Sequence, residues 1–207
     1  MDQFSRSILL MLVLLNPFIL SVYMIDLIRT LDFHSLSRHM IRAAVISLLV
    51  FWGFAVMGDT VFEEVLQVRF ASFLIFGGVT FLIIGIRLIM GMGPAMVGLQ
   101  PESTGISGAI AMPLLIGPGT ISASVLAGSR LPWLEAVLAI LIAVAAMTIA
   151  IILFKKVHDY VRRRNEPLVH KYLEVAGRVT ALFTGSFAIE MIMNGLQVWI
   201  AVFEAGV

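Results

Sequence analysis

The chain has 207 residues, of which 60% are hydrophobic and only 13% are charged. This composition excludes a soluble globular domain, and several apolar runs reach the length of about 20 residues that a helix needs to cross a bilayer. The net charge of +1 says nothing about partners, and the absence of cysteine excludes disulfides, thiolate catalysis and thiolate metal sites.

The apolar runs predict six transmembrane helices. In chain order they cover residues 4–26, 40–57, 70–90, 106–127, 133–154 and 177–202. Two connections are longer than the others, a segment rich in glycine and proline before the fourth helix and a polar, basic segment over 155–176. We therefore predict an all-α membrane protein made of two three-helix halves, residues 1–92 and 106–207, with a linker over 93–105.

The distribution of basic residues predicts the orientation. Six spans place three connections on one side of the membrane, and that side carries eleven of the 14 lysines and arginines. The other side carries only Arg6, Arg69 and Arg130. Because basic residues favour the cytoplasmic side, both termini are expected outside the cytoplasm. The apolar run after Arg6 lacks a small-residue cleavage pattern, which is typical of an uncleaved first span.

Two of the predicted helices contain a proline near their middle. The first contains Asn16-Pro17, and the fourth contains Gly117-Pro118-Gly119. A proline inside a helix frees backbone groups from the hydrogen-bond ladder. In lipid those groups must find partners, so such breaks persist only where protein or a cavity receives them. Matched breaks at mid-membrane therefore indicate a site, although a single proline would more simply be read as a kink.

The two halves also share a second motif. Residues 77–85 and 177–185 are identical at five of nine positions, with an offset of 100, and the proline breaks align with an offset of 101. Three spans in each half, an odd number, require the second half to insert upside down. Inverted repeats with broken helices are typical of transporters, whose substrate lies near the bilayer midplane.

The breaks offer chemistry that suits a zwitterion. A half-helix that follows a proline presents free N–H groups, and one that precedes it presents free carbonyls. Asn16 adds an amide at one break. Glu190 is the only acidic residue well inside a span, and Asn194 lies one turn further on the same face. Glu190 can neighbour an ammonium group, carry a coupling proton or only fix helix packing, and these readings stay open.

Four motifs together resemble the MarC family of bacterial inner-membrane proteins. They are Asn16-Pro17, Gly58-Asp59-Thr60, Gly77-Gly78 and the block from Met112 to Ile121 that contains Pro-x-x-x-Gly-Pro-Gly. The resemblance covers essentially the whole chain. It implies a multi-pass protein of the bacterial inner membrane, related to transporters of small neutral amino acids and similar to the lysine-exporter superfamily.

The resemblance also implies which residues bind substrate. It puts the residues of the two breaks at the site and includes Glu190 without fixing its role. With the neighbouring Thr120 and Asn194, the candidate substrate-binding residues are Asn16, Pro17, Gly117, Pro118, Gly119, Thr120, Glu190 and Asn194. The chain departs from the family after Pro17, where residues 18–22 are bulkier than the glycine and second proline of many members, so the substrate is left open.

We therefore predict a secondary transporter for a small neutral amino acid, such as glycine or alanine, or a similar zwitterion. The alternatives are export of another small metabolite and a non-transporting membrane scaffold or partner subunit. No H-E-x-x-H or G-x-S-x-G motif indicates an enzyme, and no metal or cofactor is expected. Coupling to H⁺ or Na⁺ is open. The expected partners are a small solute and the lipid bilayer, not nucleic acid, with a homo-oligomer as a further option.

Overall fold

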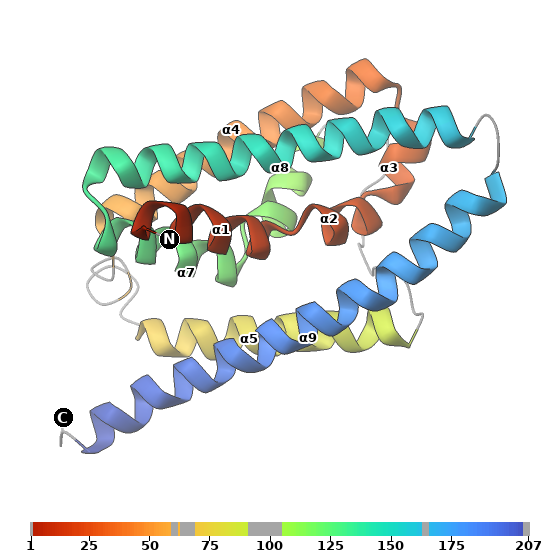
Figure 1. The fold of residues 1–207 in the computed structure, drawn as a ribbon. Helices are drawn as coiled ribbons and strands as arrows, with labels where there is room; N and C mark the ends of the chain where they lie inside the picture. The colour runs from red at the N-terminus through yellow and green to blue at the C-terminus, as the bar shows by residue number, and fades with distance from the viewer. Residues whose placement is uncertain (1, 59–61, 63–68, 91–104, 163–165, 205–207) are drawn as a thin grey trace.

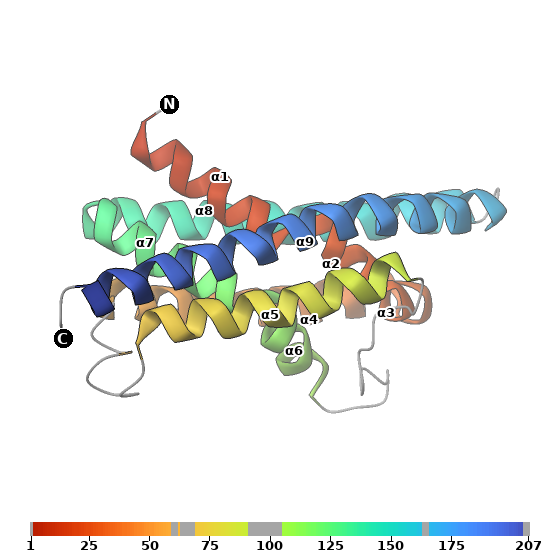
Figure 2. The ribbon, with the colours of Figure 1, turned by 90° about the horizontal axis from the view of Figure 1, so that it is seen from below.

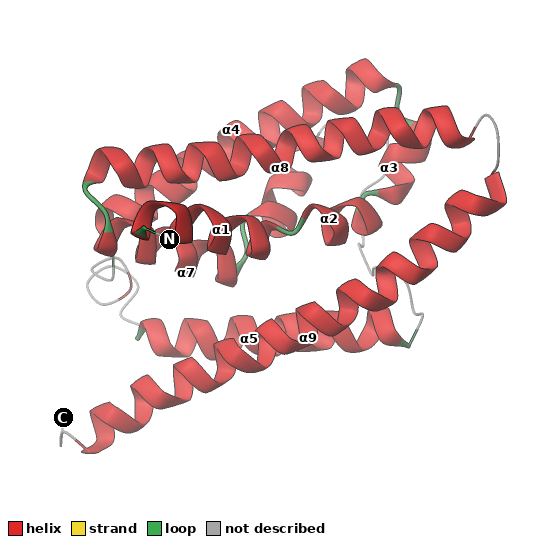
Figure 3. Ribbon diagram, viewed as in Figure 1, coloured by secondary structure: helices red, strands yellow, loops and turns green. Residues whose placement is uncertain are grey.

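The computed structural model describes residues 2–58, 62, 69–90, 105–162 and 166–204, and these residues form helices without any strand (Figures 1 and 3). The prediction of an all-α protein is confirmed. The elements are α1 (Gln3–Leu15), α2 (Pro17–Tyr23), α3 (Ile25–Thr30), α4 (Phe33–Met57), α5 (Phe70–Ile89), α6 (Ile106–Ala109), the π-helix η2 (Ile110–Leu115), α7 (Pro118–Arg130), α8 (Trp133–Arg162) and α9 (Glu166–Glu204).

Three stretches of the described helices are long and apolar enough to cross a membrane. They are Phe33–Met57, Phe70–Arg87 and Trp133–Val161, and Gln3–Leu15 is a shorter apolar helix. These lengths match the thickness of a bilayer, since about 20 helical residues span it. The count of six spans and the inverted arrangement of the two halves stay predictions.

Some helices extend further than the apolar runs that predicted them. α4 begins at Phe33 because the Asp32 carboxylate accepts a hydrogen bond of 3.0 Å from the backbone N–H of Ser35. This bond holds the pKa of Asp32 below its usual value. The predicted connection over 155–176 is itself largely helical, because α8 continues to Arg162 and α9 begins at Glu166. Hydropathy marks where the chain is apolar, whereas a helix once formed propagates into its polar flanks.

The predicted linker over 93–105 lies outside the described residues, except for Gly105.

The helices form two packed groups. α1, α4, α7 and α8 pack together, and α5 and α9 form a pair along one side of them (Figures 1 and 2). Glycines allow the backbones of this pair to approach closely. A Cβ atom on Gly78 would lie 2.7 Å from the carbonyl oxygen of Ala188, and one on Gly195 would lie 2.8 Å from that of Ala71. α5 also contacts α7, so the pair lies against the second proline break.

A buried lysine links the end of α8 to α3. Lys155 Nζ donates a hydrogen bond of 2.7 Å to the carbonyl oxygen of Ile28 and forms an ion pair of 2.8 Å with Asp159. A lysine is buried only when its charge is paired and hydrogen-bonded, and both conditions are met here. Lys155 therefore belongs to the packed interior, although the sequence analysis placed it in the polar, basic segment over 155–176.

Candidate functional site

The chain leaves the helical path at Asn16. α1 ends at Leu15, Asn16 has φ 34° and ψ 90°, and α2 begins at Pro17. Asparagine tolerates positive φ better than other residues with a side chain. The Asn16 Oδ1 atom accepts a hydrogen bond of 3.1 Å from the N–H of Phe18, which would otherwise have no partner at the start of α2. Proline suits the first helical position because it has no N–H to leave unpaired.

A second departure precedes α7. Met112 has φ −127° and ψ 118°, since a residue before proline is kept out of the helical region and Pro113 follows it. The N–H of Ile116 then donates to the carbonyl of Ala111 at 2.7 Å, a wider turn than that of an α-helix. Gly117 is extended, with φ −123° and ψ 170°, and α7 begins at Pro118.

The Thr120 side chain closes the gap between η2 and α7. Its Oγ1 atom accepts a hydrogen bond of 2.9 Å from the N–H of Gly117. Its single hydroxyl proton can reach the carbonyl oxygen of Leu115, at 2.8 Å, or that of Gly117, at 2.9 Å. Thr120 is buried. It therefore satisfies backbone groups that the interruption would leave unpaired in an apolar interior.

A cavity of about 130 Å³ lies between the two departures. Four helices each contribute one lining residue with a hydroxyl group, namely Tyr23 from α2, Thr80 from α5, Thr120 from α7 and Thr184 from α9. The backbone of Gly117 also lines it, and the remaining lining side chains are apolar. A cavity of about 150 Å³ accommodates benzene, so this one suits a molecule of a few heavy atoms.

The structure brings three of the predicted site residues to this cavity, all of them at the second break. Gly117, Pro118 and Thr120 line it. Asn16 lines a smaller neighbouring cavity of about 20 Å³, which shares Leu14, Phe81 and Thr184 with the larger one. A Cβ atom on the buried Gly119 would lie 3.4 Å from the side chains of Leu14 and Phe81, so Gly119 faces the same walls. Pro17 is half-buried and is not among the lining residues.

Glu190 and Asn194 are not brought to the cavity. Both side chains are exposed on α9, whereas Thr184, Ala188 and Met191 are buried and form its inner face. A difference of two residues along a helix turns a side chain by about 200°, so Glu190 points away from the face that carries Ala188. Their predicted part in substrate binding stays a prediction without support from this geometry.

Sequence reasoning missed Tyr23, Thr80 and Thr184. The two threonines lie within the motif that the halves share, and Thr184 is the counterpart of Ile84 at the offset of 100. Ile84 also lines the cavity. Polar residues inside an otherwise apolar repeated motif were therefore the available signal.

The comparison with known families now decides the relationship of the chain. Residues 1–200 match the family described as MarC family integral membrane protein. The chain belongs to the MarC family. The UPF0056 membrane protein PH0214 of Pyrococcus horikoshii is similar to it, with 24% identity over 202 residues that cover 94% of each protein. No solved structure matches the chain.

The cavity of this MarC protein offers hydrogen bonds without net charge. None of the described residues that line it is charged. The first N–H groups of α7 have no partner within the helix, and the positive end of the helix dipole lies at Pro118. Burial of an unpaired charge is costly, so this environment favours a solute that is neutral overall.

Proposed function

We propose that this MarC protein is a secondary transporter for a small solute that is neutral overall, with a small neutral amino acid such as glycine or alanine as the first candidate. The solute occupies the cavity between the two departures from helical structure. Its carboxylate lies toward the N-terminus of α7, and the hydroxyl groups of the lining residues accept hydrogen bonds from its ammonium group. Transporters with broken helices use the ends of the half-helices in this way.

One observation carries the proposal: the cavity is lined by a hydroxyl-bearing residue from each of four helices and, among the described lining residues, by none that is charged. A purely structural kink would need partners only for its own backbone, and Thr120 already supplies them. Tyr23, Thr80 and Thr184 come from other helices, and their polar groups favour a polar ligand.

A contact between the two halves supports the inverted repeat. Gly85 and Gly185 are equivalent at the offset of 100. A Cβ atom on Gly85 would lie 3.2 Å from the backbone nitrogen of Gly185. Equivalent residues meet where a two-fold axis passes, so this contact fits two halves related by such an axis. The proposal places the protein in the bacterial inner membrane with six spans and with both termini outside the cytoplasm.

Transport is expected to stop when the cavity is filled from Gly119. The Cβ of an alanine would meet Leu14 and Phe81 at ordinary contact distance, 3.4 Å, whereas the larger side chain of leucine has no room there. We expect proteoliposomes with wild-type protein to take up labelled glycine or alanine, Gly119→Ala to retain part of the flux and Gly119→Leu to lose it. Asn16→Leu is expected to lose it as well, because leucine tolerates the positive φ poorly and cannot cap α2.

The matched control is Gly108→Leu in α6, because nothing lies within 4 Å of a Cβ atom at this exposed glycine. Size-exclusion profiles show whether each variant still folds. Normal flux in folded Gly119→Leu and Asn16→Leu would eliminate this cavity as the transport site. If the wild type moves none of a broad panel of small amino acids and polar metabolites, the scaffold or partner-subunit alternative replaces transport.

The orientation predicts how the two ends of the chain react with thiol reagents. The protein has no cysteine, so single cysteines at Ser5 and Glu204 are unique labels. We expect both to react in intact cells with a maleimide that cannot cross the membrane. A cysteine at the exposed Lys156, on the opposite predicted side, is expected to react only after the cells are opened. The reverse pattern would invert the topology without altering the cavity.

A further inference from the structure

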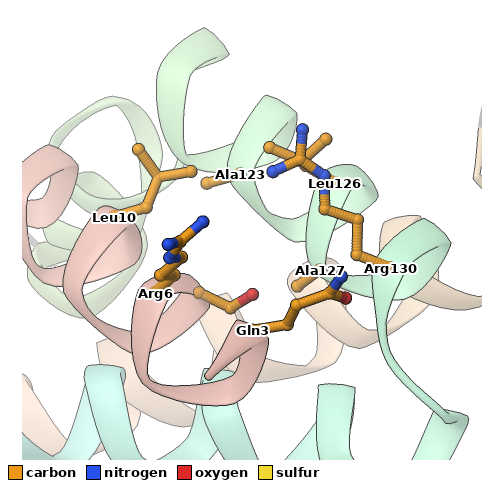
Figure 4. Close-up of a pocket in the computed structure, with 8 residues that line it drawn as sticks. Gln3, Arg6, Leu10, Ala123, Leu126, Ala127 and Arg130 are labelled. Atoms are coloured by element: carbon orange, nitrogen blue, oxygen red, sulfur yellow. The ribbon is translucent and has the colours of Figure 1, made fainter. Parts of the chain in front are cut away.

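A second cavity lies between α1 and α7, at the end of these helices away from the proline departures. Its volume is about 280 Å³. Its polar side chains are Gln3, Arg6 and Ser7 from α1 and Arg130 from α7, and the remaining lining residues are apolar. Figure 4 shows the two arginine side chains reaching from different helices toward the same space.

The two guanidinium groups bring positive charge to the same cavity. Among the residues that the structure describes, no carboxylate forms an ion pair with Arg6 or Arg130. The Asp2 carboxylate instead accepts a hydrogen bond of 3.4 Å from the N–H of Ser5 and caps α1. Arg6 also lies in the first turn of α1, where the positive end of the helix dipole disfavours a cation. An anion between the arginines would relieve both costs.

The chemistry of the lining identifies the class of ligand. Arginine binds carboxylate and phosphate oxygens through paired N–H groups, and the amide of Gln3 and the hydroxyl of Ser7 add neutral donors. We propose that this cavity is a binding site for an oxyanion, either a carboxylate or a phosphate group. The carboxylate would come from the transported solute, and the phosphate would come from a lipid headgroup.

The site lies along the same two helices, α1 and α7, as the transport cavity. Along α1, Leu10 lines the cavity that contains the two arginines, and Leu14, one turn further, lines the transport cavity. Along α7, Ala123 lines the cavity that contains the two arginines, and Thr120 lines the transport cavity. Residues three or four apart share one face of a helix, so the same faces of α1 and α7 line both cavities. If the carboxylate comes from the solute, the site is the point at which the solute enters. That role rests on the proposed transport, whereas oxyanion binding does not.

The test measures binding without flux. Full-length protein in nanodiscs of phosphatidylcholine is titrated calorimetrically with inorganic phosphate and with acetate at constant ionic strength. Saturable binding is expected, with affinity lower by at least tenfold in Arg6→Gln and Arg130→Gln. Arg69→Gln is the matched control, because Arg69 is exposed, lies on the same predicted side of the membrane and stacks on Trp199 at 4.6 Å. It is expected to bind like the wild type.

Two further arms distinguish the sources of the oxyanion. If glycine competes with phosphate for binding and Arg130→Gln removes this competition, the site binds the carboxylate of the solute. Loss of phosphate binding when phosphatidylglycerol is added to the nanodisc assigns it to a lipid headgroup. The proposal is overturned if wild-type protein shows no saturable binding of either probe, or if Arg69→Gln weakens binding as much as Arg6→Gln. Failure of glycine flux with intact phosphate binding would instead remove only the transport proposal.

Discussion

Replacement of Thr120 by valine is expected to destabilise the protein and to abolish solute flux. Valine keeps the branched shape of threonine but removes the hydroxyl that pairs with the N–H of Gly117 and a carbonyl of η2. A buried polar group left without a partner costs about 1–3 kcal/mol, and two such groups would remain. Because Thr120 also lines the cavity, the same change removes a hydroxyl group from the wall of the proposed transport site and loosens the start of α7.

Thr120→Ser is the informative control, since serine retains the hydroxyl and loses only a methyl group. We expect its thermal midpoint in detergent and its flux to lie close to those of the wild type, and those of Thr120→Val to fall well below. If valine behaves like serine in both measurements, the hydrogen bonds at this departure contribute little and the kink is held by packing alone.

Gly128→Ala is expected to lower stability by about 1–3 kcal/mol or more, although it adds only one methyl group. A Cβ atom there would overlap the carbonyl oxygen of Ala55 and would lie 2.6 Å from its carbonyl carbon. These are backbone atoms of α4, so no side chain can move aside. α4 and α7 would therefore have to separate.

The matched substitution is Gly185→Ala in the middle of α9, where nothing lies within 4 Å of a Cβ atom. Alanine favours helix over glycine by about 1 kcal/mol, so Gly185→Ala is expected to leave the thermal midpoint unchanged or to raise it. Equal midpoints for Gly128→Ala and the wild type would show that the contact between α4 and α7 is looser than the structure indicates.

The helical class could be predicted from the sequence, because it depends on composition and on apolar runs. The local structure around Asn16 and Gly117 also follows from sequence rules, since proline opens a helix and restrains the residue before it. The ends of α4 and α9 could not be placed by hydropathy, because Asp32 and Glu166 lie in polar flanks where caps and helix propagation decide.

The direction of side chains on α9 could not be predicted either. Counting residues gives the depth of Glu190 along a helix but not the side on which it lies. The apolar residues of α9 are distributed around all sides of the helix, so its sequence shows no clear amphipathic face. The pattern therefore does not separate Met191, which is buried, from Glu190, which is exposed. Only the packing of α9 against α5 distinguishes them, and α5 lies about a hundred positions earlier in the chain.

Because α9 is long, a small rotation of this helix would displace its ends by a much larger distance than its middle. Its 39 residues extend about 58 Å, nearly twice the thickness of about 30 Å of the hydrocarbon core. The contact of Gly185 with Gly85 can act as its pivot, because backbone meets backbone there. About 29 Å of helix separates this pivot from Glu166, so a rotation of about 10° would displace that end by about 5 Å. Small rearrangements around the cavity would thus become larger movements at the N-terminal end of the helix.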